Sequence, residues 1–203
     1  MIAIIDYGVG NLFSLSRSLE YLGLQSIVTR NEQDLRSADR IILPGVGAFE
    51  DAMKKLVDTG LVAAIKELVS DGKPLLGICL GMQLLFEKSY EFGQWDGLSL
   101  IRGVISPLRP EIDPALKVPH IGWNSLNFPR RSPLFKYSSE GDYVYYVHSY
   151  YARYCDDSVI ATSEYGIPVT GAVQSGRVFG TQFHPEKSGE CGLRILRAFS
   201  EVH

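Results

Sequence analysis

The stretch PLLGICLGMQLLFE, residues 74–87, decides the fold because its pattern changes from strand to helix around one residue. Pro74–Cys79 is a short apolar run typical of a buried strand, and Leu80–Lys88 follows it with helical character. At the junction, GICLG (77–81) has the spacing of a nucleophile elbow, in which glycines relieve crowding around a strained strand-to-helix turn. We therefore predict that this turn lifts the Cys79 side chain above the sheet.

Cysteine suits such a turn because its thiolate is a strong nucleophile and the start of a helix favours negative charge. The alternative is a structural cysteine buried between two packing glycines. Because strand, turn and helix patterns agree, we favour Cys79 as a nucleophile.

Upstream of the elbow, short apolar runs alternate with helical patterns. Leucines recur at spacings of three and four from Leu12 to Leu22, with Asn11 placed to cap the helix and Gly23 to stop it. The remaining elements predicted here are strands at 2–6, 25–29 and 40–43, and helix over 48–71 with an interruption at 60. This alternation predicts parallel strands in a sheet covered on both faces.

The second half changes character at about residue 98, where Pro and Gly punctuate short strands. The predicted strands are Tyr143–His148, Ser158–Thr162, Pro168–Gln174 and Val178–Phe183. Their close spacing favours antiparallel pairing, with a hairpin turn at Gln174–Arg177. A final helix is predicted over Gly189–Phe199. The expected fold class is α/β, a mostly parallel sheet flanked by helices with an added antiparallel portion, in a single domain over residues 1–203.

Composition limits the functional classes. The 203 residues are 45% hydrophobic and 21% charged with a net charge of −3, which argues against disorder and gives no reason to expect nucleic acid or membrane as a partner. The three cysteines, Cys79, Cys155 and Cys191, are widely spaced and suggest neither a disulfide framework nor a zinc site. We expect a cytoplasmic protein that needs no metal or organic cofactor.

Two glycine-rich loops follow predicted strands but do not match nucleotide-binding loops. The third glycine of the dinucleotide fingerprint is replaced by Phe13 after Gly8-Val9-Gly10, and by Glu50 after Gly45-Val46-Gly47. Such a loop can still present backbone N–H groups to an anion.

The general base for Cys79 would be one of the four histidines of the chain. His184 lies in FHPE (183–186), between an apolar strand and the last helix, and Glu186 two residues on could orient its imidazole. His148 ends another strand and is the rival base, but it has no acid nearby in the sequence. His203 is the last residue and is expected to be solvated. The sequence favours a Cys79–His184–Glu186 triad.

These motifs resemble a known family. GICLGMQLLFE, PGVG and QFHPEKS together resemble the class I, triad-type glutamine amidotransferases. IIDYGVGNL near the N-terminus and PHIGWN at 119–124 resemble one branch of that class, the glutaminase subunits of imidazole glycerol phosphate synthases. The matching blocks extend from residue 2 to about residue 199.

The resemblance implies that glutamine is hydrolysed to glutamate and ammonia through a γ-glutamyl thioester. The ammonia would pass to a separate synthase (cyclase) subunit, bound as a heterodimer, which makes imidazole glycerol phosphate and aminoimidazole carboxamide ribotide in histidine biosynthesis. Look-alike subunits for surface-polysaccharide amidation share most of these blocks and are the alternative. A non-catalytic scaffold and a stand-alone γ-glutamyl hydrolase are the other readings left open.

The resemblance also implies roles for individual residues. Cys79, His184 and Glu186 would be catalytic, and backbone N–H groups of Leu80 and of Val46 or Gly47 would form the oxyanion hole. Gly45, Gln83, Glu91, Ser149 and Tyr150 would contact glutamine, although Ser89-Tyr90-Glu91 replaces the more usual Ser-Glu-Glu. The residues expected at the partner interface are Asn11, His120, Trp123, Tyr145 and Lys187. By pattern alone, the last two groups would instead be core or solvated side chains.

Overall fold

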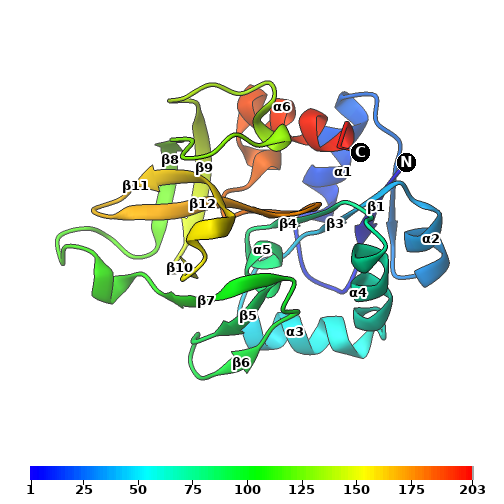
Figure 1. The fold of residues 1–203 in the computed structure, drawn as a ribbon, viewed down its shortest axis with the longest axis horizontal. Coiled ribbons are helices and arrows are strands. Elements are labelled where there is room, and N and C mark those ends of the chain that lie inside the picture. Colours follow the sequence, from blue (N-terminus) through cyan, green and yellow to red (C-terminus); the bar gives the residue numbers. More distant parts are fainter. Residues whose placement is uncertain (203) are drawn as a thin grey trace.

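A computed structural model describes residues 1–202 and places a seven-stranded sheet at the centre of the molecule (Figure 1). Its strand order is β11-β12-β13-β4-β3-β1-β2. The strands are β1 (Ile2–Ile5), β2 (Ser26–Thr29), β3 (Arg40–Leu43), β4 (Leu75–Ile78), β11 (Val159–Glu164), β12 (Pro168–Ser175) and β13 (Val178–Thr181). Strands β13, β4, β3, β1 and β2 are parallel, whereas β11 and β12 add an antiparallel edge. This confirms the predicted fold class.

Helices cover both faces of this sheet. Helices α1 (Leu12–Tyr21) and α6 (Gly189–Ser200) lie on one face, and α2 (Glu32–Ser37), α3 (Phe49–Asp58) and α4 (Val62–Ser70) lie on the other (Figure 1). Strand β1 is buried throughout because its alternate residues enter two different cores. Continuous apolar runs such as IAII are typical of strands covered on both sides.

Local signals in the first half act as predicted. The Asn11 side chain accepts a hydrogen bond from the Ser14 N–H at 3.4 Å, and Gly23 beyond the helix has φ +70°. Gly60, with φ +75°, separates α3 from α4. Helix α2 was not predicted, because it is short and only Leu35 is buried. Its N-terminus is capped by Asn31, which accepts from the Gln33 N–H at 2.8 Å.

Two smaller sheets flank the central one. A four-stranded sheet has the order β10-β7-β5-β6, and β8 pairs with β9 in a two-stranded sheet. Their bounds are β5 (Phe86–Ser89), β6 (Trp95–Asp96), β7 (Ile101–Pro107), β8 (His120–Ser125), β9 (Tyr143–His148) and β10 (Tyr150–Arg153). Strands β9 and β10 meet at Ser149, so this part of the chain reaches from one small sheet to the other.

One prediction in this region was wrong. The helix after the elbow, α5, covers only Leu80–Leu84, and β5 begins at Phe86 instead of continuing the helix to Lys88. The apolar run suits either period, and pairing with β7 decides for a strand. Strand β13 pairs antiparallel with β12, as expected, but also parallel with β4, so the antiparallel strands extend the main sheet. The predicted hairpin turn is confirmed, with Ser175 opposite Val178 and Gly176 at φ +57°.

Within residues 1–202, none of the helices combines the length and apolarity that crossing a bilayer would require. His203 lies outside the described residues.

Candidate active site

The turn between β4 and α5 has the strained geometry of a nucleophile elbow. Cys79 lies at φ 54° and ψ −110°, a conformation that residues with a side chain rarely adopt. A Cβ on Gly77 would lie 2.6 Å from the Gly81 carbonyl oxygen, and a Cβ on Gly81 would lie 1.9 Å from the Leu43 carbonyl oxygen. Both glycines are therefore sterically required, as the GICLG spacing predicted.

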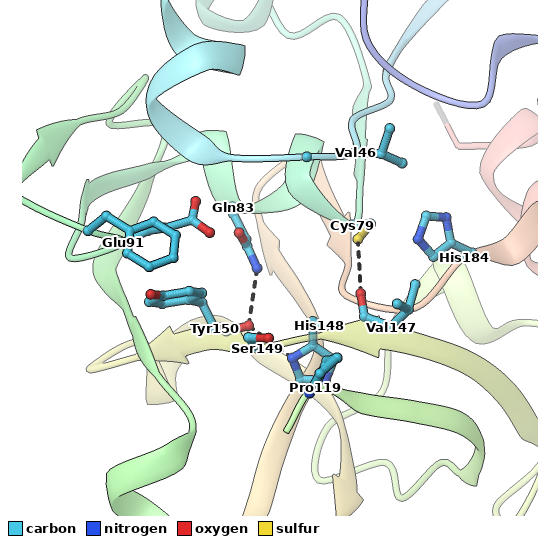
Figure 2. A pocket seen from close by; sticks show the side chains of 12 residues that line it. Val46, Cys79, Gln83, Glu91, Pro119, Val147, His148, Ser149, Tyr150 and His184 are labelled. Carbon is cyan, nitrogen blue, oxygen red and sulfur yellow. Dashed lines mark hydrogen bonds between the residues drawn. The ribbon is translucent and has the colours of Figure 1, made fainter. Parts of the chain in front are cut away.

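The Cys79 sulfur lies among groups from β9 and from the end of β13. Its backbone N–H donates to the Thr181 carbonyl at 2.7 Å, which ties the turn to β13. The sulfur lies 3.9 Å from the Val147 carbonyl oxygen (Figure 2), and the Gln182 side-chain amide donates to the sulfur at 3.8 Å. The sulfur is thus only slightly exposed but opens on a cavity.

His184 and Glu186 form a buried hydrogen-bonded pair next to this sulfur. The His184 Nδ1–H donates to the Glu186 carboxylate at 2.8 Å, and the two side chains are 2% and 3% exposed. Pro185 between them begins a short 3-10 turn that holds the pair together. His184 Nε2 is buried and has no hydrogen-bond partner within residues 1–202. Figure 2 shows the His184 ring beside Cys79 in the same pocket.

Charge keeps His184 protonated. Burial alone lowers the pKa of its imidazole, but the Cys79 sulfur and the Glu186 carboxylate outweigh that effect and raise the pKa to about 9. Near neutral pH the ring is therefore an imidazolium whose Nε2 proton lies on the side of the Cys79 sulfur.

Cys79 and His184 open on a cavity of about 390 Å³ between the elbow and the β9–β10 segment (Figure 2). The 12 residues that line it are Val46, Gly47, Cys79, Gln83, Glu91, Phe92, Pro119, Val147, His148, Ser149, Tyr150 and His184. The cavity lies at the carboxyl ends of β3, β4 and β13, where open α/β sheets bind their ligands. It thus gathers most of the residues predicted for catalysis, the oxyanion hole and glutamine binding, whereas Gly45, Leu80 and Glu186 are not among its lining residues.

The loop after β3 packs directly against the elbow. A Cβ on Gly45 would lie 2.7 Å from the Gly81 backbone nitrogen, so the two chain segments touch. Leu80 is the first residue of α5, and its N–H has no partner within the helix. Val46 and Gly47 line the cavity on the same side. The structure thus brings together the backbone groups predicted to bind an oxyanion.

On the other side of the cavity, the side-chain amide of Gln83 donates two hydrogen bonds. Its Nε2 donates to the Tyr150 carbonyl at 3.1 Å and to the Gln182 side-chain oxygen at 3.0 Å. The amide oxygen of Gln83 is then the group available to a ligand. The Glu91 carboxylate accepts from the Phe49 N–H at the start of α3, and burial raises the pKa of this carboxyl.

The backbone of the β9–β10 segment is turned towards the cavity. Tyr150 lies opposite Pro107 of β7, and the Ser149 carbonyl accepts from the Leu108 N–H at 2.9 Å. In an antiparallel ladder this spacing marks a pair without mutual hydrogen bonds, so the polar groups of Tyr150 point away from β7. The N–H of Tyr150 is therefore placed to meet a ligand in the cavity.

His148 is not a free base. Its Nδ1–H donates to the Tyr150 carbonyl at 2.9 Å, so its Nε2 accepts a hydrogen bond from His120 Nδ1 at 3.0 Å. Burial lowers the pKa of His148 to about 3 and that of His120 to about 4, so both rings are neutral. Both nitrogens of His148 are occupied, which leaves His184 as the base that fits the geometry.

The residues expected at a partner interface divide into two groups. Trp123 is 55% exposed on β8 and lies opposite Tyr145 of β9, and the Lys187 ammonium lies 5.9 Å from the Tyr145 ring. The side chain of His120, in contrast, is buried between the Tyr146 and Tyr165 rings, so it offers no surface to a partner. That corrects the expectation for the His120 side chain. Asn11 caps α1 and lies near Pro44, Val46 and Glu186.

One residue at this site was missed. Gln182 is fully buried and its amide bridges the Cys79 sulfur and Gln83. The signal was present in QFHPEKS, because residues 182 and 184 lie two apart beyond an apolar strand. Among residues 1–202 there is no group of three or more His, Cys, Asp or Glu side chains placed to hold a metal ion.

Comparison with known proteins agrees with this geometry. The family model for class I glutamine amidotransferases matches residues 3–201. The chain therefore belongs to the class I glutamine amidotransferase family.

Curated relatives of the chain come from one branch of this family. The chain is 51% identical over 202 residues to the imidazole glycerol phosphate synthase subunit HisH of Listeria monocytogenes serovar 1/2a, covering 100% of this chain and 96% of that one. It is 52% identical to the subunit of the same name from Bacillus cereus, covering 100% and 95%.

Solved structures share the fold at much lower identity. A glutamine amidotransferase structure superimposes with a TM-score of 0.75 at 16% identity, covering 98% of this chain and 100% of that one. The structure of PurLQS from Thermotoga maritima gives 0.74 at 18% identity, covering 98% and 96%. These likenesses support the fold alone.

Proposed function

We propose that this chain is the glutaminase subunit of an imidazole glycerol phosphate synthase. It hydrolyses glutamine and supplies ammonia to a separate synthase (cyclase) subunit, which makes imidazole glycerol phosphate and aminoimidazole carboxamide ribotide in histidine biosynthesis. The observation that carries the proposal is the cavity in which a strained cysteine lies beside a histidine whose second nitrogen is held by a buried glutamate. The sequence identity of 51% and 52% to two HisH subunits, over the full chain, supports this branch of the family.

In the first half of the reaction, the Cys79 sulfur attacks the side-chain amide carbon of glutamine. The carbonyl oxygen becomes an oxyanion, which the N–H of Leu80 and that of Val46 or Gly47 stabilise. A donor of this kind typically contributes about 10²–10³ in kcat. His184 gives its Nε2 proton to the amide nitrogen, the C–N bond breaks, and ammonia leaves a γ-glutamyl thioester on Cys79.

In the second half, water attacks the thioester carbon. His184, now neutral, takes a proton from this water, and the carbon–sulfur bond breaks to release glutamate and the sulfur. The net reaction is glutamine plus water to glutamate plus ammonia. Glu186 keeps the Nδ1 proton in place, so that Nε2 always faces the sulfur. Gln83, Glu91 and the backbone of Ser149 and Tyr150 hold the amino-acid end of the substrate, and Gly45, which packs against the elbow, is proposed to contact the substrate as well.

The partner would bind on the exposed face of the β8–β9 sheet. Ile121, Trp123 and Tyr143 are each more than half exposed there, and Ile121 lies opposite Val147, which lines the cavity. A contiguous apolar face next to a reactive cavity is typical of an interaction site. We propose that the synthase subunit covers this face as the second half of a heterodimer, with Trp123, Tyr145, Lys187 and Asn11 in the contact. A single domain over 1–203 in the cytoplasm completes the proposal.

Two measurements test this function. Expression in a histidine auxotroph that lacks its own glutaminase subunit should restore growth without added histidine, whereas a well-expressed Cys79→Ala variant should not. Glutaminase activity should be slow for the chain alone and faster with the liganded synthase subunit. Equal rates with and without that subunit would contradict the proposal. Failure to complement despite good expression would favour the polysaccharide-amidation branch instead.

A further inference from the structure

The N-terminal block IIDYGVGNL contains a buried tyrosine that the proposed reaction does not use. Tyr7 follows β1 and is 3% exposed. Its hydroxyl donates to the Pro44 carbonyl at 2.6 Å, across 37 residues of sequence. Pro44 begins the PGVG loop, which holds one of the two candidate oxyanion donors. The hydroxyl therefore binds the loop at the point where that loop leaves β3.

The same peptide is confined from other directions. A Cβ on Gly45 would lie 2.7 Å from the Tyr7 hydroxyl and 2.7 Å from the Gly81 nitrogen, so Gly45 is clamped between Tyr7 and the elbow. A Cβ on Gly10 would lie 3.0 Å from Pro44 Cβ, so the loop after Tyr7 touches Pro44 as well. The Pro44–Gly45 peptide thus has contacts with both the first βα loop and the nucleophile elbow.

Fixing this peptide fixes the start of the oxyanion loop. A peptide unit is planar, so a hydrogen bond at the Pro44 oxygen sets the orientation of the Gly45 N–H as well. The next peptide carries the Val46 N–H. Further along, the Phe49 N–H is held by Glu91. The Gly45–Ala48 segment therefore has one anchor on each side, and Tyr7 supplies the one nearest to the candidate donor.

We propose that Tyr7 is a positioning residue whose hydroxyl holds the Pro44–Gly47 loop so that its N–H aims at the oxyanion. This inference rests on the proposed glutaminase function. The hydroxyl remains a donor throughout the working pH range, because burial, with a further contribution from the charge of Cys79, raises the pKa of Tyr7 above its ordinary value. The hydrogen bond of the phenol goes to the Pro44 carbonyl, so Tyr7 acts through the backbone.

The test is Tyr7→Phe, studied in the complex with the synthase subunit. Two reactions of Cys79 are compared: glutamine hydrolysis, which passes through an oxyanion, and alkylation by iodoacetamide, a direct displacement at a saturated carbon that forms none. Misplacing one oxyanion donor should lower kcat by about 10- to 100-fold, with KM changed by no more than about twofold. The alkylation rate should stay within about twofold of wild type.

Tyr146→Phe is the matched control, since Tyr146 is equally buried and its hydroxyl bonds Ser163 far from the loop. It should keep wild-type turnover while showing a similar change in thermal midpoint. Gly10→Ala presses on Pro44 from the other side and should also lower kcat without affecting alkylation. The inference is overturned if Tyr7→Phe keeps wild-type kcat, or if turnover and alkylation fall together. If the wild-type complex does not hydrolyse glutamine at all, the proposed function fails and this inference fails with it.

Discussion

Glu186 accepts the Nδ1 proton of His184 at 2.8 Å, whereas the opposite nitrogen of the same ring has no partner within the described chain. A buried polar atom without a hydrogen bond costs free energy, so it calls for an explanation. Here the explanation is chemical, because that nitrogen faces the Cys79 sulfur and the cavity.

Replacing Glu186 by Gln should therefore impair the reaction without removing the base. The amide can donate to Nδ1 and thereby stabilise the wrong tautomer, with the proton on Nε2. We expect kcat to fall by at least about 10²-fold, by analogy with other triads. Steady-state kinetics measure this, with Glu190→Gln on the exposed side of α6 as the control. A Glu186→Gln variant with more than a tenth of wild-type kcat would exclude Glu186 as the orienting acid.

The raised pKa of His184 makes a prediction about stability. Its folded-state pKa is about 9, above the ordinary 6.5, so the folded protein holds this proton more tightly than the unfolded chain. The stabilisation is fully present below pH 6.5 and is lost as the pH rises from there through 9. Denaturant unfolding at pH 6, 7.5 and 9 should show this loss for wild type and a smaller loss for Glu186→Gln. Identical pH dependence in the two proteins would contradict it.

The neutral histidines His120 and His148 predict the opposite pH dependence, a loss of unfolding free energy as the pH falls. Their folded-state pKa values, about 4 and about 3, lie below 6.5, so unfolding takes up protons between these limits. Stability is complete above pH 6.5 and falls as the pH drops, by up to about 1.4 kcal/mol per pH unit for each ring. Unfolding of wild type and His148→Gln between pH 7 and 4.5 should give a shallower slope for the variant.

The backbone strain at Cys79 should be measurable as a difference in unfolding free energy between two variants. Both Cys79→Ala and Cys79→Gly abolish the proposed reaction, but only glycine adopts φ 54° and ψ −110° without strain. A strained residue costs about 1–3 kcal/mol, so Cys79→Gly should unfold at higher denaturant than Cys79→Ala. Each variant serves as the other's control for loss of the sulfur. Equal midpoints would show that the turn stores no strain.

Gln182 should matter for both folding and turnover. Gln182→Met keeps the shape but leaves a Gln83 hydrogen without its acceptor and the sulfur without its donor. We expect a loss of about 1–3 kcal/mol in unfolding free energy together with reduced kcat. Gln174→Met, at the less buried end of β12, is the control. A variant that loses stability but keeps full kcat would limit Gln182 to a structural role.

Trp123 tests the partner surface. Trp123→Ala should change the stability of the isolated chain by less than about 0.5 kcal/mol, because the ring is 55% exposed. It should weaken binding of the synthase subunit by about 2 kcal/mol, or roughly 30-fold, if the ring is a central contact. Titration calorimetry measures the affinity of each variant for the synthase subunit. The control is Tyr21→Ala, which removes an exposed aromatic side chain at the far end of α1. Equal affinities for the two variants would place the interface elsewhere.

The parts of the site that could be predicted are encoded locally. The spacing of the glycines around Cys79 is a local pattern, and the His184-Pro185-Glu186 run fixes its geometry within three residues, so the sequence alone indicates a nucleophile and an oriented base. The helical caps at Asn11 and Gly23 are equally local.

The rest depends on contacts between distant segments. The burial of His120 and the tautomer of His148 follow from the β8–β9 pairing, and neither residue signals it alone. The early end of α5 is set by β5 pairing with β7. Gln182 gains its role from Gln83, 99 residues away in the sequence.

The contact of Gly81 with the Leu43 carbonyl has a consequence for engineering. A Cβ on Gly81 would lie 1.9 Å from the Leu43 carbonyl oxygen, so the turns after β3 and β4 fit together only as a rigid pair. Anyone who grafts a new nucleophile turn onto this scaffold would need to transplant the neighbouring PGVG segment with it, because neither piece has room to adjust to a foreign counterpart.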